Sequence, residues 1–415
     1  MSNFVSSLGR AQLTSLSSFA EERRSRVSAG QRLVWLDAIK GIAACIIVGH
    51  HLSLYSPSSD LADQFAPSLM YGLYFYGLFV VQMFLVFGGF GLAMALSDQP
   101  ISWKKSLASF GSRYVRLAAP YLVMLLLLTT VSWSTLGGAM QPPLIDSFSW
   151  WQLLAHIFFL QDILGFGNLS AGTWYLCIDL QYVGLFLIIR AGLHSFGKLV
   201  NREFFAPVAM SALLIPLGIA SAWIWNRSAQ NESYVFYFLG SLVLGTLAAW
   251  TLKGHVSKWV LLLYALALAA SLTIDFRPRI LVALGSVIVI YLVSRFGSRL
   301  SVPRPLLWLG KISYSLFLIH YLVNGLVLHG LASWIGDSPF RAFASMVVAL
   351  FASLGAATVL HFAVEAPCHR WLKSLATKSL PRSSHAFSVQ SLDARGADMC
   401  FAMSKELPRA ELERA

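Results

Sequence analysis

The chain has 415 residues, of which 57% are hydrophobic and only 12% are charged, whereas soluble domains carry about a quarter charged residues. Its mean hydropathy is +0.65. This composition excludes a disordered chain, a collagen-like chain and an ordinary soluble enzyme, and it predicts an all-α, polytopic membrane helix bundle. The net charge of +12 favours a membrane protein with basic cytoplasmic flanks over a nucleic-acid-binding protein, because the basic residues border apolar segments.

Two polar ends enclose one long apolar region. Residues 1–34 are Ser-rich and basic and lack the apolar core of a signal peptide, so we expect a flexible cytoplasmic tail. Residues 373–415 have mixed charge and no sustained apolar period, which predicts a second flexible cytoplasmic tail. Residues 35–372 then form the transmembrane domain.

The apolar region divides into ten segments of bilayer length, about 20 residues each. The predicted spans are 36–55, 70–96, 114–135, 172–192, 204–225, 234–252, 258–275, 279–295, 308–330 and 341–363. The stretch 150–164 is apolar and aromatic but short, which indicates an interfacial or re-entrant helix.

The basic residues predict the orientation of these spans. With ten spans and both termini in the cytoplasm, Arg227, Arg277, Arg279 and Arg341 are the basic residues that fall outside, among 31 Lys and Arg in total. This distribution obeys the positive-inside rule and supports the helix count.

The first span holds the densest set of polar side chains: Asp37, Lys40, His50 and His51. At 100° per residue, Lys40 and His51 lie within about 20° of one helix face, with His51 roughly 16 Å further along, whereas His50 lies about 100° away. Charged and imidazole groups within a span are costly, so they are functional candidates. The alternative is structural: Asp37 and Lys40 form a helix-end ion pair, and His51 is a hydrogen-bonded interfacial residue.

Arg113 and Arg116 lie three residues apart at the start of the third span, so they share a helix face and could bind phosphate oxygens in bidentate fashion. Basic anchoring at the cytoplasmic edge is the alternative. Asp179 lies within the fourth span with no Lys or Arg within one turn. A carboxylate at that depth needs a partner from another helix or stays protonated.

Weaker candidates lie in the late spans: Tyr314, His320 and Glu365. Gly88, Gly89 and Gly91 are typical of close helix packing in a bilayer. The four cysteines lack metal-ligand spacing, and we therefore expect no metal site.

Six segments of this chain resemble, in order, the motifs of the acyltransferase 3 family, whose members are integral-membrane O-acyltransferases that modify glycans. They are Leu36–Ala44 with His51 fourteen residues after Asp37, Met83–Phe90, Arg113–Leu117 followed by Pro120 and Tyr121, Trp174–Asp179, Ile312–His320 and Val364–Pro367. The resemblance covers about residues 34–372. Lys40 stands where the family usually has Arg, Gly88 or Gly89 replaces the usual Ser, and Asp179 replaces the usual Glu.

The resemblance implies transfer of an acyl group, acetyl in particular, from acyl-CoA as co-substrate to a sugar hydroxyl of a surface or secreted glycan or of a lipid-linked sugar. His51 would be the general base or the acyl acceptor, since imidazole titrates near neutrality, and Asp179 could orient it. Lys40, Arg113 and Arg116 would bind the donor. Trp174, which lies in a matching segment, is a further candidate with no assigned role. A passage should then connect the arginines to His51. The implied location is the bacterial inner (plasma) membrane, in contact with lipid and not with nucleic acid.

Two other functions compete with this interpretation. A proton-coupled transporter or exporter also places His and Asp within spans, although no inverted repeat is visible in this sequence. An exporter of lipid-linked glycan polymers that performs no chemistry would have no need of His51.

Overall fold

The structure is a computed structural model and describes residues 34–96, 101–135, 149–202 and 204–378. These residues form helices and connecting turns and contain no strand, which confirms the predicted all-α class. The two predicted tails fall on residues outside the described ranges, apart from Val34 and the end of the last helix.

The chain order of the helices is as follows. The first helix is Val34–Tyr55, and it is followed by α2 (Ser59–Phe65), α3 (Pro67–Tyr76), α4 (Val81–Ala95), α5 (Trp103–Thr135), α6 (Trp150–Ile157), α7 (Thr173–Leu199), α8 (Ala206–Trp223), α9 (Val235–Leu252), α10 (Lys258–Ala270), α11 (Pro278–Phe296), α12 (Arg304–Gly330), α13 (Ala332–Ile335), α14 (Pro339–Leu360), a π-helix (His361–Glu365) and α15 (Ala366–Lys378).

Within the described ranges, nine helical segments are long and apolar enough to cross a membrane. The predicted span 258–275 corresponds to a shorter apolar helix, Lys258–Thr273. The predicted polytopic bundle is therefore confirmed, while the cytoplasmic placement of the termini stays a prediction. The third helix begins at Trp103, well before the predicted residue 114. The predicted start was too late because the first turns of this helix carry basic and polar side chains.

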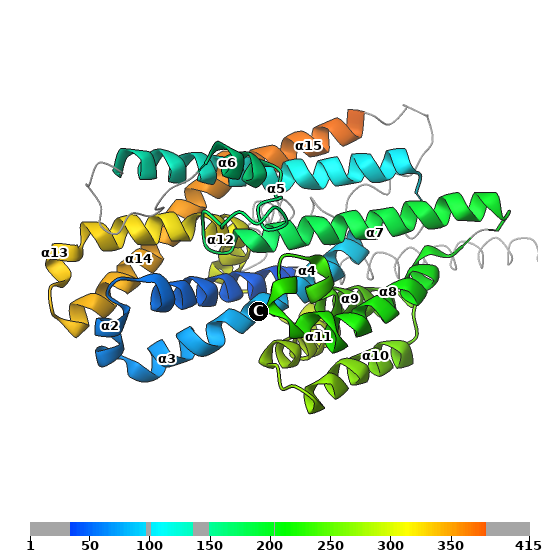
Figure 1. The fold of residues 1–415 in the computed structure, drawn as a ribbon, viewed down its shortest axis with the longest axis horizontal. Coiled ribbons are helices and arrows are strands. Elements are labelled where there is room, and N and C mark those ends of the chain that lie inside the picture. Colours follow the sequence, from blue (N-terminus) through cyan, green and yellow to red (C-terminus); the bar gives the residue numbers. More distant parts are fainter. Residues whose placement is uncertain (1–33, 97–100, 136–148, 203, 379–415) are drawn as a thin grey trace, which may run out of the picture.

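The bundle has two apolar cores. One is formed mainly by the first helix, α5, α12 and α14, and the other by α4, α8, α9 and α11. Figure 1 shows α12, α13 and α14 gathered at one end of the molecule, and α8 to α11 gathered apart from them. Helix α7 contributes buried residues to both cores, for example Leu176 to the first and Ile178 to the second, so it joins the two halves.

Glycines allow α4 and α9 to cross at backbone contact. A Cβ on Gly89 would overlap the Leu242 carbonyl, and a Cβ on Gly245 would overlap the Val86 carbonyl. Small residues permit such close approach in a bilayer, where van der Waals packing drives helix association. The packing role predicted for Gly89 is thus confirmed, whereas Gly91 has open space at its Cβ position.

Candidate functional site

The first helix and α12 also cross at glycines. A Cβ on Gly41 would lie 2.6 Å from the Leu309 carbonyl carbon, and a Cβ on Gly310 would lie 2.7 Å from the Asp37 carbonyl carbon. His51 lies ten residues beyond Gly41, and His320 lies ten residues beyond Gly310. Each histidine is therefore about 15 Å beyond the crossing along its own helix.

The two histidines form a hydrogen-bonded pair. His51 Nδ1 lies 2.7 Å from His320 Nε2, and the ring planes are only 12° apart with centroids separated by 4.9 Å. The His320 ring is fully buried, and His51 is half-buried. The sequence analysis identified both residues as candidates but did not predict their contact, because 269 positions separate them.

A backbone carbonyl determines which ring nitrogens carry hydrogen. His320 Nδ1 lies 3.1 Å from the Leu316 carbonyl oxygen, which can only accept a hydrogen bond. A neutral His320 therefore donates from Nδ1 and accepts at Nε2, so His51 donates from its own Nδ1. This leaves the lone pair of His51 on Nε2, which makes Nε2 the basic atom of the pair.

The other polar residues of the first helix have local partners. His50 lies 2.9 Å through Nδ1 from the Leu73 carbonyl oxygen of α3 and is buried. Lys40 donates to Asp37 at 3.1 Å, and both side chains are substantially exposed. The structural alternative for Asp37 and Lys40, a helix-end ion pair, is present, and donor binding by Lys40 stays a prediction.

Arg113 of α5 binds Asp179 of α7. The guanidinium donates from Nη2 to both carboxylate oxygens at 2.9 Å and from Nε at 3.2 Å. The Asp179 side chain is 6% exposed and that of Arg113 is 30% exposed. This confirms the expectation that Asp179 takes its partner from another helix. The suggested contact of Asp179 with His51 is replaced by this ion pair, since His320 holds the His51 ring.

Arg116 turns toward a different helix. Its Nε donates to His369 Nε2 of α15 at 2.9 Å, and Figure 1 shows α5 and α15 side by side. The two arginines of α5 therefore diverge: Arg113 reaches inward to α7, and Arg116 stays exposed. Phosphate binding by the two arginines stays a prediction.

Aromatic rings occupy the space between the imidazole pair and the ion pair. The Phe317 ring lies 6.4 Å from His320 and 5.8 Å from Tyr175 between centroids. Tyr175 donates through its hydroxyl to the Phe84 carbonyl at 3.1 Å and stands one turn before Asp179 on α7. The predicted passage between the arginines and His51 stays a prediction.

The remaining predicted candidates each have a defined partner in the structure. Trp174 stacks on Phe238 of α9 with centroids 5.4 Å apart. Tyr314 donates to the Leu117 carbonyl of α5 at 2.8 Å. Glu365 accepts through Oε2 from the Ser315 hydroxyl at 2.6 Å and from His361 Nδ1 at 3.0 Å, at a π-helix of the kind that often marks functional sites.

The segment predicted to be interfacial or re-entrant begins with α6, which has only eight residues. Its end turns back against α5: Tyr114 donates to the Ile157 carbonyl at 2.8 Å, and the Tyr121 hydroxyl lies 2.9 Å from His156 Nδ1. These contacts, deep along α5, support the re-entrant alternative.

Gly88 and Gly89 differ in their surroundings. A Cβ on Gly88 would lie 3.4 Å from the Tyr175 hydroxyl and 3.7 Å from Asp179 Oδ1, which is ordinary contact. Gly89 faces the α9 backbone instead. Of the two positions, Gly88 is therefore the one at which a serine hydroxyl would reach the Arg113–Asp179 pair.

The fold and these contacts define a polytopic membrane protein with a hydrogen-bonded histidine pair and a separate ion pair between α5 and α7. Within the described ranges, no three His, Cys, Asp or Glu side chains converge as metal ligands would. A family model described as an acyltransferase domain matches residues 33–362. The chain therefore belongs to the acyltransferase 3 family and is a membrane acyltransferase. No curated protein and no solved structure matches the chain significantly.

Proposed function

We propose that the chain is an acyl-CoA-dependent O-acyltransferase that transfers an acyl group, acetyl in particular, to a sugar hydroxyl of a surface or secreted glycan or a lipid-linked sugar. The observation that carries the proposal is the His51–His320 pair, in which Nε2 of His51 keeps its lone pair. We place the protein in the bacterial inner membrane, with both termini in the cytoplasm.

His51 would act as the general base. As the sugar oxygen attacks the acyl carbonyl carbon, the hydroxyl proton moves to His51 Nε2. The carbon–sulfur bond then breaks, and the departing CoA thiolate receives that proton. A hydroxyl is a weak nucleophile at neutral pH, so removal of its proton in the transition state contributes about 10²–10⁴-fold. If Nε2 instead attacks the carbonyl first, an acyl-imidazole forms and then acylates the sugar.

Donor binding would use the two arginines of α5. Arg116 is exposed beside His369, and a guanidinium suits the phosphates of a nucleotide-bearing thioester. Arg113 would contribute N–H groups beyond those that bind Asp179. The acyl-bearing arm must then pass Phe317 and Tyr175 to reach His51, so this proposal requires those rings to move when the donor binds.

The test uses membranes from a deletion strain that carries either the wild-type chain or a variant. With [¹⁴C]acetyl-CoA as the probe, His51→Gln should lower acetyl incorporation into the glycan fraction by at least about 100-fold. His194→Gln, at a half-buried histidine of α7 far along the chain from this pair, is the matched control and should be active. Wild-type incorporation by a well-folded His51→Gln variant would refute the proposed role of His51.

A further inference from the structure

A second polar site lies on the other side of α4. Gln82 and Phe84 are two residues apart on α4, so their side chains point in nearly opposite directions. Phe84 faces Phe317, whose ring lies next to His320, whereas Gln82 lines a pocket between α4, α8, α9 and α11. The pocket is open to solvent, and its enclosed part has room for about one water-sized group, so a charged group could enter it while the rest of a ligand stays outside.

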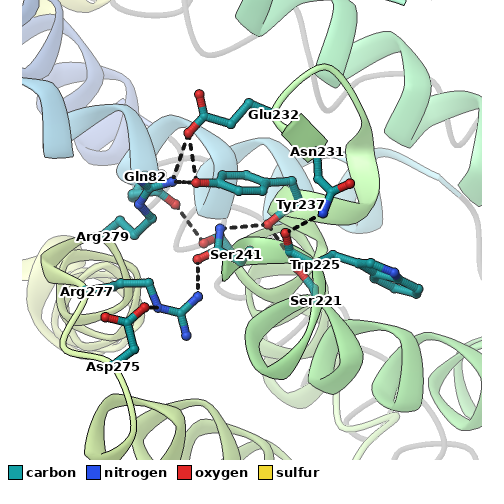
Figure 2. Close-up of polar contacts among 11 residues, drawn as sticks. Gln82, Ser221, Trp225, Asn231, Glu232, Tyr237, Ser241, Asp275, Arg277 and Arg279 are labelled. Atoms are coloured by element: carbon teal, nitrogen blue, oxygen red, sulfur yellow. Dashed lines mark hydrogen bonds and ion pairs between the residues drawn. The ribbon is translucent and has the colours of Figure 1, made fainter. Parts of the chain in front are cut away.

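Arg277 does not line this pocket, but it binds two residues that do. It donates to Asn226 Oδ1 at 2.7 Å and to the Ala222 carbonyl at 2.8 Å, and it pairs with Asp275 at 3.3 Å. These contacts join the end of α8 to the start of α11 (Figure 2). Burial lowers the pKa of Arg277, the paired Asp275 carboxylate raises it, and the neighbouring Arg227 and Arg279 lower it.

Gln82 presents a donor to the pocket. Its Oε1 accepts from the Ser241 hydroxyl at 2.9 Å, so the orientation of the amide is determined and its NH₂ group points the other way. That nitrogen has no hydrogen-bond partner among the described residues, although Gln82 is only 7% exposed. The nitrogen is not fully buried, so water in the pocket can reach it, and an oxygen atom of a ligand could replace that water as its acceptor.

Arg279 supplies the charge at the same pocket. Its guanidinium lies over the Tyr237 ring at 5.1 Å, donates to the Tyr237 hydroxyl and lies 3.5 Å from Glu232. Figure 2 shows Arg279 and Gln82 next to each other beside Tyr237. Glu232 is half exposed, so it is a weak partner that a ligand oxyanion could replace.

We propose that this pocket binds an oxyanion, a carboxylate or a phosphate, carried by a sugar. The Gln82 amide and the Arg279 guanidinium provide converging N–H donors, which suits the oxygens of either group. The hydroxyls of Ser241 and Tyr237 provide further contacts of the kind a sugar ring uses. The site is separate from the imidazole pair, and its binding can be measured without acyl transfer.

Binding to the purified chain in detergent tests the proposal, by equilibrium dialysis against radiolabelled glucuronate, glucose 1-phosphate and glucose. We expect at least one of the two anions to bind and glucose to bind at least tenfold more weakly. The anion that binds identifies the group. Failure of both anions to bind, or equal binding of glucose, would overturn the proposal whether or not the chain transfers acyl groups.

Variants locate the binding. Gln82→Leu and Arg279→Met should each weaken anion binding at least tenfold, whereas Glu232→Gln should strengthen it, because a competing carboxylate is removed. Arg227→Met is the control, since it removes the same charge from an exposed neighbour that does not line the pocket. If Arg227→Met weakens binding as much as Arg279→Met, binding follows the general positive potential and the site is refuted.

Discussion

Removal of the hydrogen-bond acceptor at His320 should impair acyl transfer without removing the base. His320→Leu leaves the Nδ1–H group of His51 without its partner at 2.7 Å. Because His51 becomes charged only as Nε2 takes the proton, the acceptor matters most in the transition state, where a hydrogen bond to a charged group contributes about 1.5–3 kcal/mol. Its loss corresponds to about a 10- to 150-fold decrease in kcat at 1.4 kcal/mol per tenfold. His320→Gln retains an oxygen acceptor near the position of Nε2, so it should recover part of this activity.

The measurement is the rate of [¹⁴C]acetyl transfer in membranes at equal amounts of folded protein. A double-mutant cycle with His51→Gln provides the sharper readout, since residues that act as a unit are not additive. We expect His320→Leu to have little further effect once His51 is replaced. Wild-type activity of His320→Leu, or full additivity in the cycle, would refute the argument that His320 acts through His51.

Two further predictions concern the glycines of α4 and the ion pair between α5 and α7. Gly88→Ser should fold and retain activity because its added atoms meet only ordinary contacts. Gly89→Ser should be strongly destabilised because its Cβ overlaps the α9 backbone. Thermal unfolding in detergent compares the two variants, and equal stability would contradict the packing argument. Arg113→Leu should lower the free energy of unfolding by about 3–5 kcal/mol because it leaves the Asp179 carboxylate buried without a partner. Arg113→Leu combined with Asp179→Leu should recover most of that loss. A double variant no more stable than Arg113→Leu would contradict the pairing.

Hydropathy predicted the bundle well, since each predicted span coincides with an apolar helix of the structure. The start of α5 was missed because Lys104 and Lys105 lower the hydropathy of its first turn. Helical spacing singled out His51, but it placed Lys40 and His51 on one functional stripe. The structure instead pairs Lys40 with Asp37 and His51 with His320, because those contacts depend on the neighbouring side chain and on which helix crosses there.

A single sequence does not predict which residues of different helices contact one another. The glycine crossing at Gly41 and Gly310 brings His51 to His320, yet each glycine alone indicates only close packing. Asp179 clearly needed a partner, but nothing local named Arg113. Tyr175 and Phe317 lie within segments that resemble the family, but neither was named as a candidate, because aromatic residues are common in apolar spans and their role depends on their position in the fold.

The arrangement separates two electrostatic problems that a membrane enzyme must solve. A charge within a bilayer is costly unless an opposite charge is in direct contact, and Asp179 meets that requirement through bidentate contact with Arg113. A base that used Asp179 as its partner would place the carboxylate between two competing cations. His51 uses a neutral imidazole, whose own orientation comes from the Leu316 carbonyl. The pair is uncharged before the reaction, and when Nε2 accepts a proton the hydrogen bond to His320 and the carbonyl beyond it stabilise the new charge.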